Sequence, residues 1–218
     1  MRPRAGCLAT ALLVALAGPA GAQPRPPITH EQALENLRKP DVEARRQAAG
    51  WLGELGSMAD APVLIRALRD PDEVVRALAE NSVWQVWSRS GDSEADALLQ
   101  LGIEQMNQRD ARAAIETFTR VIERKPDFAE GWNKRATVYF LIGEYARSLR
   151  DCDEVIKRNP DHFGALAGYG QIYLELDKPE RALEYFQRAL AVNPNLHGVE
   201  VTVEHLKRLL IERRRGTV

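Results

Sequence analysis

Cysteine is scarce in this sequence, with two among 218 residues. Cys7 lies within an N-terminal segment, residues 1–22, that we expect to be removed, which leaves Cys152 as a single thiol. One thiol cannot form an internal disulfide, so the fold must be stabilised by packing even in an oxidising compartment. Cys152 falls at a helix position expected to face inward, where a free cysteine behaves as a small hydrophobic residue.

Aromatic residues are also few, at 6% of the chain, and no segment shows the Val/Ile/Thr-rich alternation of a strand. Abundant Ala, Leu, Arg and Glu favour helices throughout. After residue 22, no stretch is long and apolar enough to span a bilayer. Removal of Arg2 and Arg4 lowers the basic count from 30 to 28 against 31 acidic residues, a balance that argues against nucleic acid as a partner.

Motifs of the common enzyme classes are missing. Neither a GxxxxGK[ST] phosphate loop nor a GxGxxG after a strand occurs, and no Ser–His–Asp or Cys–His arrangement is suggested. His197, Glu200 and Glu204 can share one helix face and are the best candidates for metal ligands. We interpret them instead as a solvated face with acids near a helix N-terminus. The sequence therefore predicts a protein that is not an enzyme, with no cofactor and no metal site.

The first residues have the pattern of a secretory signal peptide. A short basic start is followed by small and apolar residues from Ala5 to Ala17 and by Ala20-Gly21-Ala22. This predicts a signal peptide over residues 1–22, cleaved after Ala22. The apolar stretch is shorter than the roughly 20 residues that a membrane anchor needs. Residues 23–29 are rich in proline, which predicts an extended linker.

A 34-residue period dominates the second half of the chain. It relates seven sets of positions, beginning with Pro126, Pro160 and Pro194. Small residues recur at one position and large ones at another, as expected when two antiparallel helices pack closely and a proline follows the second. The other six sets are Leu98, Trp132 and Leu166; Gly102, Ala136 and Gly170; Gln105, Tyr139 and Tyr173; Ala114, Ser148 and Ala182; Phe118, Cys152 and Phe186; Val121, Val155 and Ala189.

These residues resemble the tetratricopeptide repeat (TPR) family, with the middle copy nearest in its Trp132-Asn-Lys-Arg-Ala136-x-x-Tyr139. The resemblance implies three repeats over residues 95–128, 129–162 and 163–196. Cys152 departs from the pattern because the family usually has an aromatic residue there. Residues 197–214 then form an amphipathic helix, which we expect to cap the array, because terminal repeats need a partly polar cover.

A second, weaker period of 31 residues lies upstream, where Pro40-Asp41 and Arg45 correspond to Pro71-Asp72 and Arg76. This resembles the short HEAT-type repeats of bacteria, over residues 30–91. The two aspartates suit helix N-caps, and the two arginines are expected to reach carbonyls or carboxylates between repeats. The predicted fold class is therefore all-α, a right-handed α-solenoid of helix hairpins with two HEAT-like units, three TPR units and a C-terminal capping helix.

The TPR resemblance also implies a binding site, because the first helices of successive repeats in that family line a concave groove that receives peptides or helices. The 34-residue register places these groove residues: Leu99, Ile103, Met106, Asn133, Lys134, Thr137, Phe140, Gln171 and Leu174. Some family members clamp a terminal carboxylate with several cations, but here Lys134 alone is basic. In a competing interpretation, the HEAT-like part covers Leu99 and Ile103 and makes them core.

We therefore expect a scaffold or adaptor that binds a protein or peptide partner in an apolar groove. The alternative is an accessory or regulatory subunit of an envelope enzyme whose catalytic chain is separate. The signal peptide and the bacterial character of both repeat types predict export to a bacterial periplasm, with no membrane span after cleavage. Trp84 and Trp87, three residues apart, are expected to belong to the core instead of stacking on a ligand.

Overall fold

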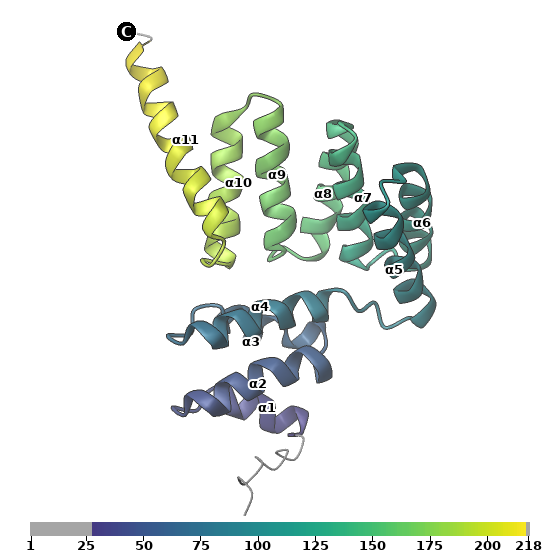
Figure 1. The fold of residues 1–218 in the computed structure, drawn as a ribbon, viewed down its shortest axis with the longest axis vertical. Helices are drawn as coiled ribbons and strands as arrows, with labels where there is room; N and C mark the ends of the chain where they lie inside the picture. Colours follow the sequence, from purple (N-terminus) through teal and green to yellow (C-terminus); the bar gives the residue numbers. More distant parts are fainter. Residues whose placement is uncertain (1–27, 217–218) are drawn as a thin grey trace, which may run out of the picture.

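The computed structural model describes residues 28–216, and within this range all regular structure is helical (Figure 1). The predicted signal peptide and most of the predicted linker lie outside the described residues. The α-solenoid of helix hairpins expected from the sequence is confirmed. No helix among residues 28–216 is both long and apolar enough to cross a membrane.

The HEAT-like part consists of four helices and one short 3-10 helix, Met58–Asp60. The helices are α1 (His30–Asn36), α2 (Val42–Leu55), α3 (Ala61–Ala67) and α4 (Glu73–Trp87). Asp41 and Asp72 cap α2 and α4 through their carboxylates, as expected. The guanidinium of Arg45 donates to the carbonyls of residues 39 and 40 and to the carboxylate of Asp70, and Arg76 donates to the carbonyls of residues 70 and 71.

The TPR array follows as three antiparallel hairpins and a final helix. Its elements are α5 (Ser93–Asn107) with α6 (Ala111–Arg124), α7 (Ala129–Leu141) with α8 (Tyr145–Arg158), α9 (Phe163–Glu175) with α10 (Pro179–Val192), and α11 (His197–Gly216). The turn inside each hairpin contains one residue with positive φ, and these residues are again 34 apart: Arg109, Gly143 and Asp177. Only the middle one is glycine, the residue that adopts this conformation without strain.

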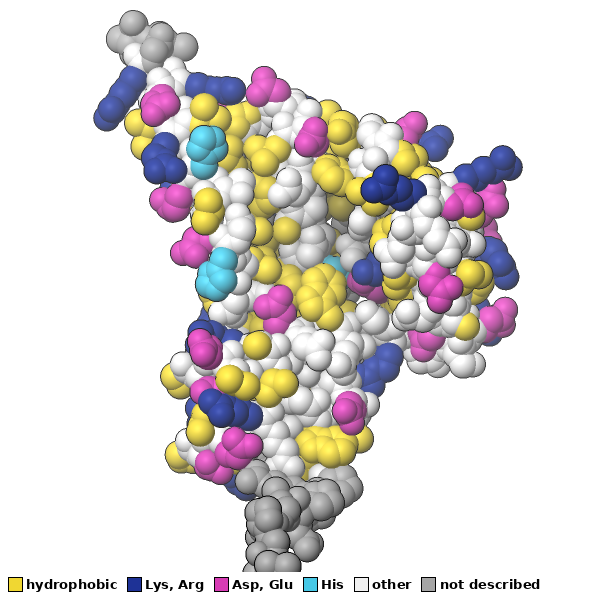
Figure 2. Space-filling view, viewed as in Figure 1, with side chains coloured by type: hydrophobic (Ala, Val, Ile, Leu, Met, Phe, Trp, Pro, Cys, Tyr) yellow, Lys and Arg dark blue, Asp and Glu magenta, His cyan; other side chains and the backbone are white. Residues whose placement is uncertain are grey.

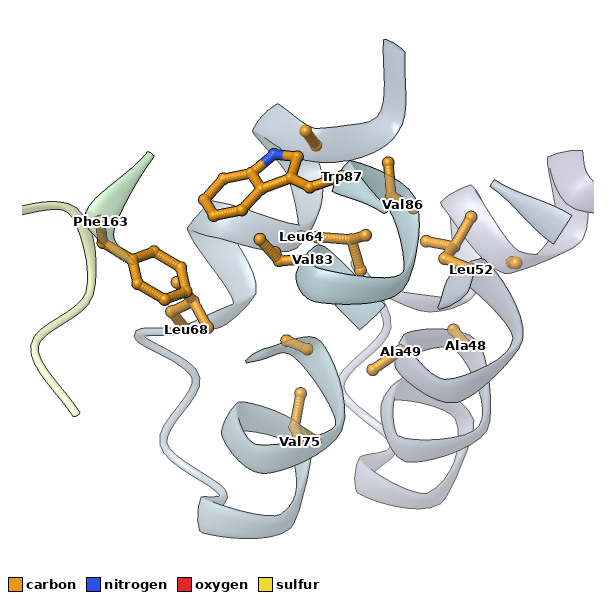
Figure 3. Packing of buried hydrophobic residues seen from close by; sticks show 13 residues of the cluster. Ala48, Ala49, Leu52, Leu64, Leu68, Val75, Val83, Val86, Trp87 and Phe163 are labelled. Carbon is orange, nitrogen blue, oxygen red and sulfur yellow. The ribbon is translucent and has the colours of Figure 1, made fainter. Parts of the chain in front are cut away.

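The HEAT-like part packs across one end of the TPR array, beneath α9 and the start of α11 (Figure 1). Phe163, at the start of α9, is buried in the same cluster as Leu68 and Trp87 (Figure 3). Val192, the last residue of α10, and Leu196, from the loop that follows, pack against this cluster. The two repeat types therefore share one hydrophobic core instead of being joined by a flexible linker.

Polar contacts reinforce this interface. The guanidinium of Arg69 donates to the carbonyls of Ala191 and Val192, and the side-chain amide of Asn195 donates to the carbonyl of Leu68 at 2.8 Å. These carbonyls lie at the ends of α10 and α3, where the helix itself leaves acceptors unpaired. The HEAT-like part thus covers the junction loops of the TPR array, not the first TPR helix that the competing interpretation of the groove assigned to it.

Candidate functional site

A pocket of about 120 Å³ opens between α7 and α9, the first helices of repeats two and three. Hereafter it is called the groove pocket, and it is lined by Asn133, Ala136, Thr137, Phe140, Ser148, Cys152, Gly164, Ala165, Gly168, Gln171 and Ile172. Four of the predicted groove residues are among them: Asn133, Thr137, Phe140 and Gln171. Figure 2 shows the molecule hollowed between α9 and the α5–α7 side, with hydrophobic side chains along the hollow.

Leu99 is a correction to the predicted groove. Its side chain is fully buried in a cluster with Phe118, Val121 and Val138, so it forms part of the core of repeat one and cannot contact a partner. Asn133 occupies the equivalent position in repeat two and lines the groove pocket. The apolar side chain of Leu99 instead turns inward. The burial comes from the neighbouring TPR helices, not from the HEAT-like part.

The remaining predicted residues lie beside the groove pocket. Ile103 and Met106 are half-buried against the Leu99 cluster, and Met106 also lines a wider hollow at the tips of repeats one and two, which includes Leu141 and Ile142. Leu174 is half-buried against the cluster that joins α10 to α11. None of these three residues lines the groove pocket, although Thr137 lines both that pocket and the hollow that contains Met106.

Lys134, the one basic groove residue, is paired with a buried acid. Glu130 is 1% exposed; the Lys134 ammonium lies 2.9 Å from Glu130 Oε1, outside hydrogen-bonding geometry, and His162 Nε2 lies 2.9 Å from Glu130 Oε2. Burial raises the pKa of Glu130, but the hydrogen bond from His162 and the ammonium charge of Lys134 outweigh burial, so the net shift of that pKa is downward. The carboxylate is therefore ionised and neutralises the lysine.

Trp84, from α4, packs against Gly164, which lines the groove pocket, and the sequence did not reveal this contact. A Cβ atom added to Gly164 would lie 2.5 Å from Cη2 of Trp84, so the indole packs directly on this glycine of α9. The Lys134 ammonium lies 5.9 Å from the centre of the indole ring, within the range of a cation–π contact. The sequence predicts that Trp84 and Trp87 belong to the core. Trp87 is buried in the cluster shared by the two repeat types, and Trp84 is half-buried and packs against the same cluster.

Cys152 lines the floor of the groove pocket and is 3% exposed. Burial, with smaller contributions from Asp151 and Asp153, raises the pKa of the thiol to about 12. The thiolate is the nucleophilic form of cysteine, so this residue is poorly suited to covalent chemistry at neutral pH. Its contribution to the site is its small volume.

No group of three or more His, Cys, Asp or Glu side chains in the described part of the chain is arranged to hold a metal ion. Of the possible ligands on α11, His197 Nδ1 lies 3.7 Å from Glu200, and these side chains are 85% and 62% exposed. The two side chains form a solvent-exposed contact near the start of the helix.

Comparison with known proteins identifies both repeat types. The tetratricopeptide repeat model matches residues 99–155 and 142–196, and the HEAT repeats model matches residues 31–119, so the latter match extends into the first TPR hairpin. The chain is a tetratricopeptide repeat protein with HEAT-like repeats. This agrees with the two sequence periods and with the helix pairs described above.

Two curated relatives illustrate the similarity. A TPR repeat-containing protein of Rhizobium etli is 32% identical over 58% of this chain and 61% of its own length. Small glutamine-rich tetratricopeptide repeat-containing protein 2 of Saccharomyces cerevisiae is 27% identical over 68% of this chain and 44% of its own length. The chain thus spans about three fifths or less of these relatives.

Solved TPR domains share the fold of the array. The first TPR of Spaghetti (RPAP3), bound to an HSP90 peptide, has a TM-score of 0.52 and 24% identity, and the match covers 55% of this chain and 96% of that domain. The Sgt2 TPR domain of Aspergillus fumigatus has a TM-score of 0.54 and 20% identity, with 58% and 85% covered. At these identities the similarity establishes the fold alone.

Proposed function

We propose that this protein is a non-catalytic adaptor that binds a linear peptide or a helix of another protein on the concave face of its TPR array. The observation that carries the proposal is the groove pocket, because four residues placed in the groove by the 34-residue register line one concavity between α7 and α9. An apolar floor with a few amides at its rim suits a peptide whose side chains enter the pocket while its backbone remains accessible to hydrogen bonds.

The comparisons support this class of function. The Spaghetti domain is bound to an HSP90 peptide, and the TPR2B domain of yeast Sti1, with a TM-score of 0.51 and 19% identity, is in complex with an Hsp70 peptide. The partner proposed here differs in its chemistry from the acidic HSP90 peptide, because Lys134 is already neutralised by Glu130. A lysine that is already neutralised gives an acidic tail little advantage, so an uncharged segment is favoured at the groove pocket.

We also propose that the protein acts after export, in a bacterial periplasm, on the basis of the signal-peptide pattern in residues 1–22. The test is the N-terminal sequence of the protein recovered from the envelope fraction of the cells that produce it. Processed protein should begin at Gln23. Recovery of the chain with Met1 intact, in the cytoplasmic fraction, would contradict export and leave the adaptor role to be tested separately.

The adaptor role is tested with a matched pair of substitutions. Gln171 is exposed at the rim of the groove pocket, whereas Gln187 is exposed on α10, a helix that contributes nothing to the pocket. Gln171→Arg places a long, positively charged side chain over the pocket, and Gln187→Arg makes the same chemical change on α10. Tagged wild type and Gln187→Arg should capture the same partner from the envelope fraction, and Gln171→Arg should lose it.

The same experiment separates the adaptor from an accessory subunit. A partner that is an enzyme, with a turnover rate that changes when this protein is added, identifies the regulatory alternative. Capture that is equal for Gln171→Arg and wild type would place the binding surface outside the groove and overturn the proposal.

A further inference from the structure

Repeats one and three share a pair of residues that repeat two replaces. In repeat one, a Cβ atom added to Gly102 would lie 2.4 Å from the ring of Phe118, and in repeat three a Cβ atom on Gly170 would lie 2.4 Å from the ring of Phe186. Each phenylalanine therefore fills the space that its glycine leaves free, and neither position tolerates an added methyl group without a shift of the ring.

Repeat two has Ala136 and Cys152 at the same two positions. Alanine adds the Cβ atom that the phenylalanine ring would exclude, while cysteine is much smaller than phenylalanine. Ala136 and Cys152 are both buried, at 3% exposure each, and both line the groove pocket, whose volume is about 120 Å³. In repeats one and three a phenylalanine ring fills this space. In repeat two the smaller cysteine leaves it open, and it becomes the apolar floor of a pocket on the concave face.

The size and lining of this pocket define what can fill it. An apolar protein cavity of ~150 Å³ accepts a benzene molecule, so a pocket of about 120 Å³ accepts a branched or thioether side chain of slightly smaller bulk. Ala165, Phe140 and Ile172 complete the apolar walls. Burying an aliphatic side chain there removes apolar surface from water on both partners.

The charges beside the pocket define the segment that carries this side chain. Lys134 is neutralised by the buried carboxylate of Glu130, and the exposed rim residue is the uncharged Gln171. An acidic peptide would gain little from this pair, and a basic one would meet no free acid at the rim. Charge complementarity thus favours an uncharged peptide segment.

We propose that the groove pocket is a specificity pocket for one leucine or methionine side chain in an uncharged linear peptide, and that Ala136 and Cys152 determine this specificity. The proposal rests on the proposed peptide-binding function and names the chemistry of its ligand. It assigns repeat two a role that repeats one and three, with their Gly–Phe pairs, do not share.

Two substitutions close the pocket by different routes. Ala136→Gly/Cys152→Phe installs in repeat two the pair already accommodated in repeats one and three, so the fold should be retained. Gly168→Leu closes the pocket from its rim, because a Cβ atom on Gly168 meets nothing within 4 Å and its side chain extends into the concavity. Gly198→Leu is the matched control, because Gly198 is equally open but lies on α11, away from the pocket.

The experiment begins with selection of phage-displayed random dodecapeptides on the purified wild-type protein. A selected peptide is synthesised with a fluorescent label, and its Kd is measured by anisotropy for wild type and each variant. We expect the selected sequences to share one leucine or methionine and to lack a preference for acidic residues. Alanine at that position, or either pocket-closing variant, should weaken binding about tenfold or more, and Gly198→Leu should leave Kd unchanged.

The outcomes separate the specificity pocket from the groove itself. Peptides that lose affinity for Gln171→Arg but bind both pocket-closing variants as wild type does would overturn the pocket and leave the groove function standing. Peptides that bind Gln171→Arg with wild-type affinity, or a selection that yields no binder, would overturn the proposed function and the pocket with it. A consensus of acidic residues would overturn the assigned ligand chemistry.

Discussion

Glu130, at the start of α7, and His162, the N-cap residue of α9, contact each other with 2.9 Å between Oε2 and Nε2, and neither side chain is more than 1% exposed. The other ring nitrogen of His162, Nδ1, accepts the backbone N–H of Ala165 at 3.1 Å and so caps α9. An imidazole that accepts at Nδ1 carries its proton at Nε2, so His162 is a neutral donor to the carboxylate. One histidine therefore joins a helix cap to a buried acid.

Removal of the Glu130 carboxylate should destabilise the fold strongly. In Glu130→Ala, the Nε2–H of His162 and the side-chain amide of Asn133, which donates to Glu130 at 3.1 Å, both lose their acceptor in a buried site. Loss of one partner of a buried charged network costs about 3–5 kcal/mol, and we expect a decrease of about 3 kcal/mol or more in the free energy of unfolding, measured by urea denaturation. Glu116→Ala, which removes an exposed ion pair with Arg112, should change it by less than about 1 kcal/mol. Equal effects of the two substitutions would contradict this account.

Stability should decline in acid through two helix caps. Asp72 caps α4 and pairs with Arg46, and Asp92 caps α5 and pairs with Arg124; hydrogen bonds from these arginines lower the pKa of each carboxyl to about 2. A carboxyl whose pKa is lower in the folded state stabilises the fold above its ordinary pKa of about 3.9, and this contribution is lost as the pH falls to about 2.

The free energy of unfolding should therefore fall between about pH 4 and about pH 2. Asp72→Asn/Asp92→Asn retains side chains that cap helices but removes both charges, so its decline over this range should be shallower. Urea titrations at a series of pH values measure the difference. A pH dependence identical to that of wild type would show that these two carboxylates do not carry the effect.

The Gly–Phe pair of repeat three should behave as a coupled unit. Gly170→Ala alone overpacks against the Phe186 ring and should cost about 1–3 kcal/mol. Phe186→Cys alone opens a cavity and should cost about 3 kcal/mol or more. The double variant reproduces the pair found in repeat two, so its cost should be smaller than the sum by about 1 kcal/mol or more. Additive costs in this double-mutant cycle would show that the two positions do not share space.

The contact between Trp84 and Gly164 predicts a substitution that separates the two repeat types. Gly164→Ala places a Cβ atom 2.5 Å from the indole and should force α4 away from α9. Thermal unfolding should then resolve into two transitions, one for each part. Gly168→Ala lies on the same helix with open space around the added atom, and it should leave a single transition, with stability unchanged or raised by up to about 1 kcal/mol. A single transition in both variants would contradict the expectation.

The sequence predicted the helix pairs of the TPR array well because its signals are local and repeated. Prolines 34 residues apart follow the second helices, and a small residue faces a large one within each hairpin. The same register predicted Asn133, Thr137, Phe140 and Gln171 as groove residues. The register failed for Leu99. It identifies a helix face, but at the border of that face the type of side chain determines whether the residue points toward solvent or, as Leu99 does, toward Phe118.

The interface between the repeat types could not be predicted in this way. Trp84 and Gly164 contact each other although they are distant in the sequence, and neither belongs to a period that relates the HEAT-like part to the TPR array. The groove pocket likewise depends on the combined volumes of Ala136 and Cys152. The sequence showed that Cys152 departs from the repeat pattern. That Ala136 and Cys152 line the same pocket is seen only in the structure.

The contact between Asn195 and the carbonyl of Leu68 joins positions 127 residues apart. In an open array of repeats, contacts extend only to neighbours, so terminal units can unfold one at a time and folding can begin at any unit. Here the last TPR repeat cannot detach without exposing the core that it shares with the HEAT-like part. The molecule should thus fold more slowly than its helical content alone would suggest, because a long loop must close first, and afterwards it should resist fraying from its C-terminal repeat.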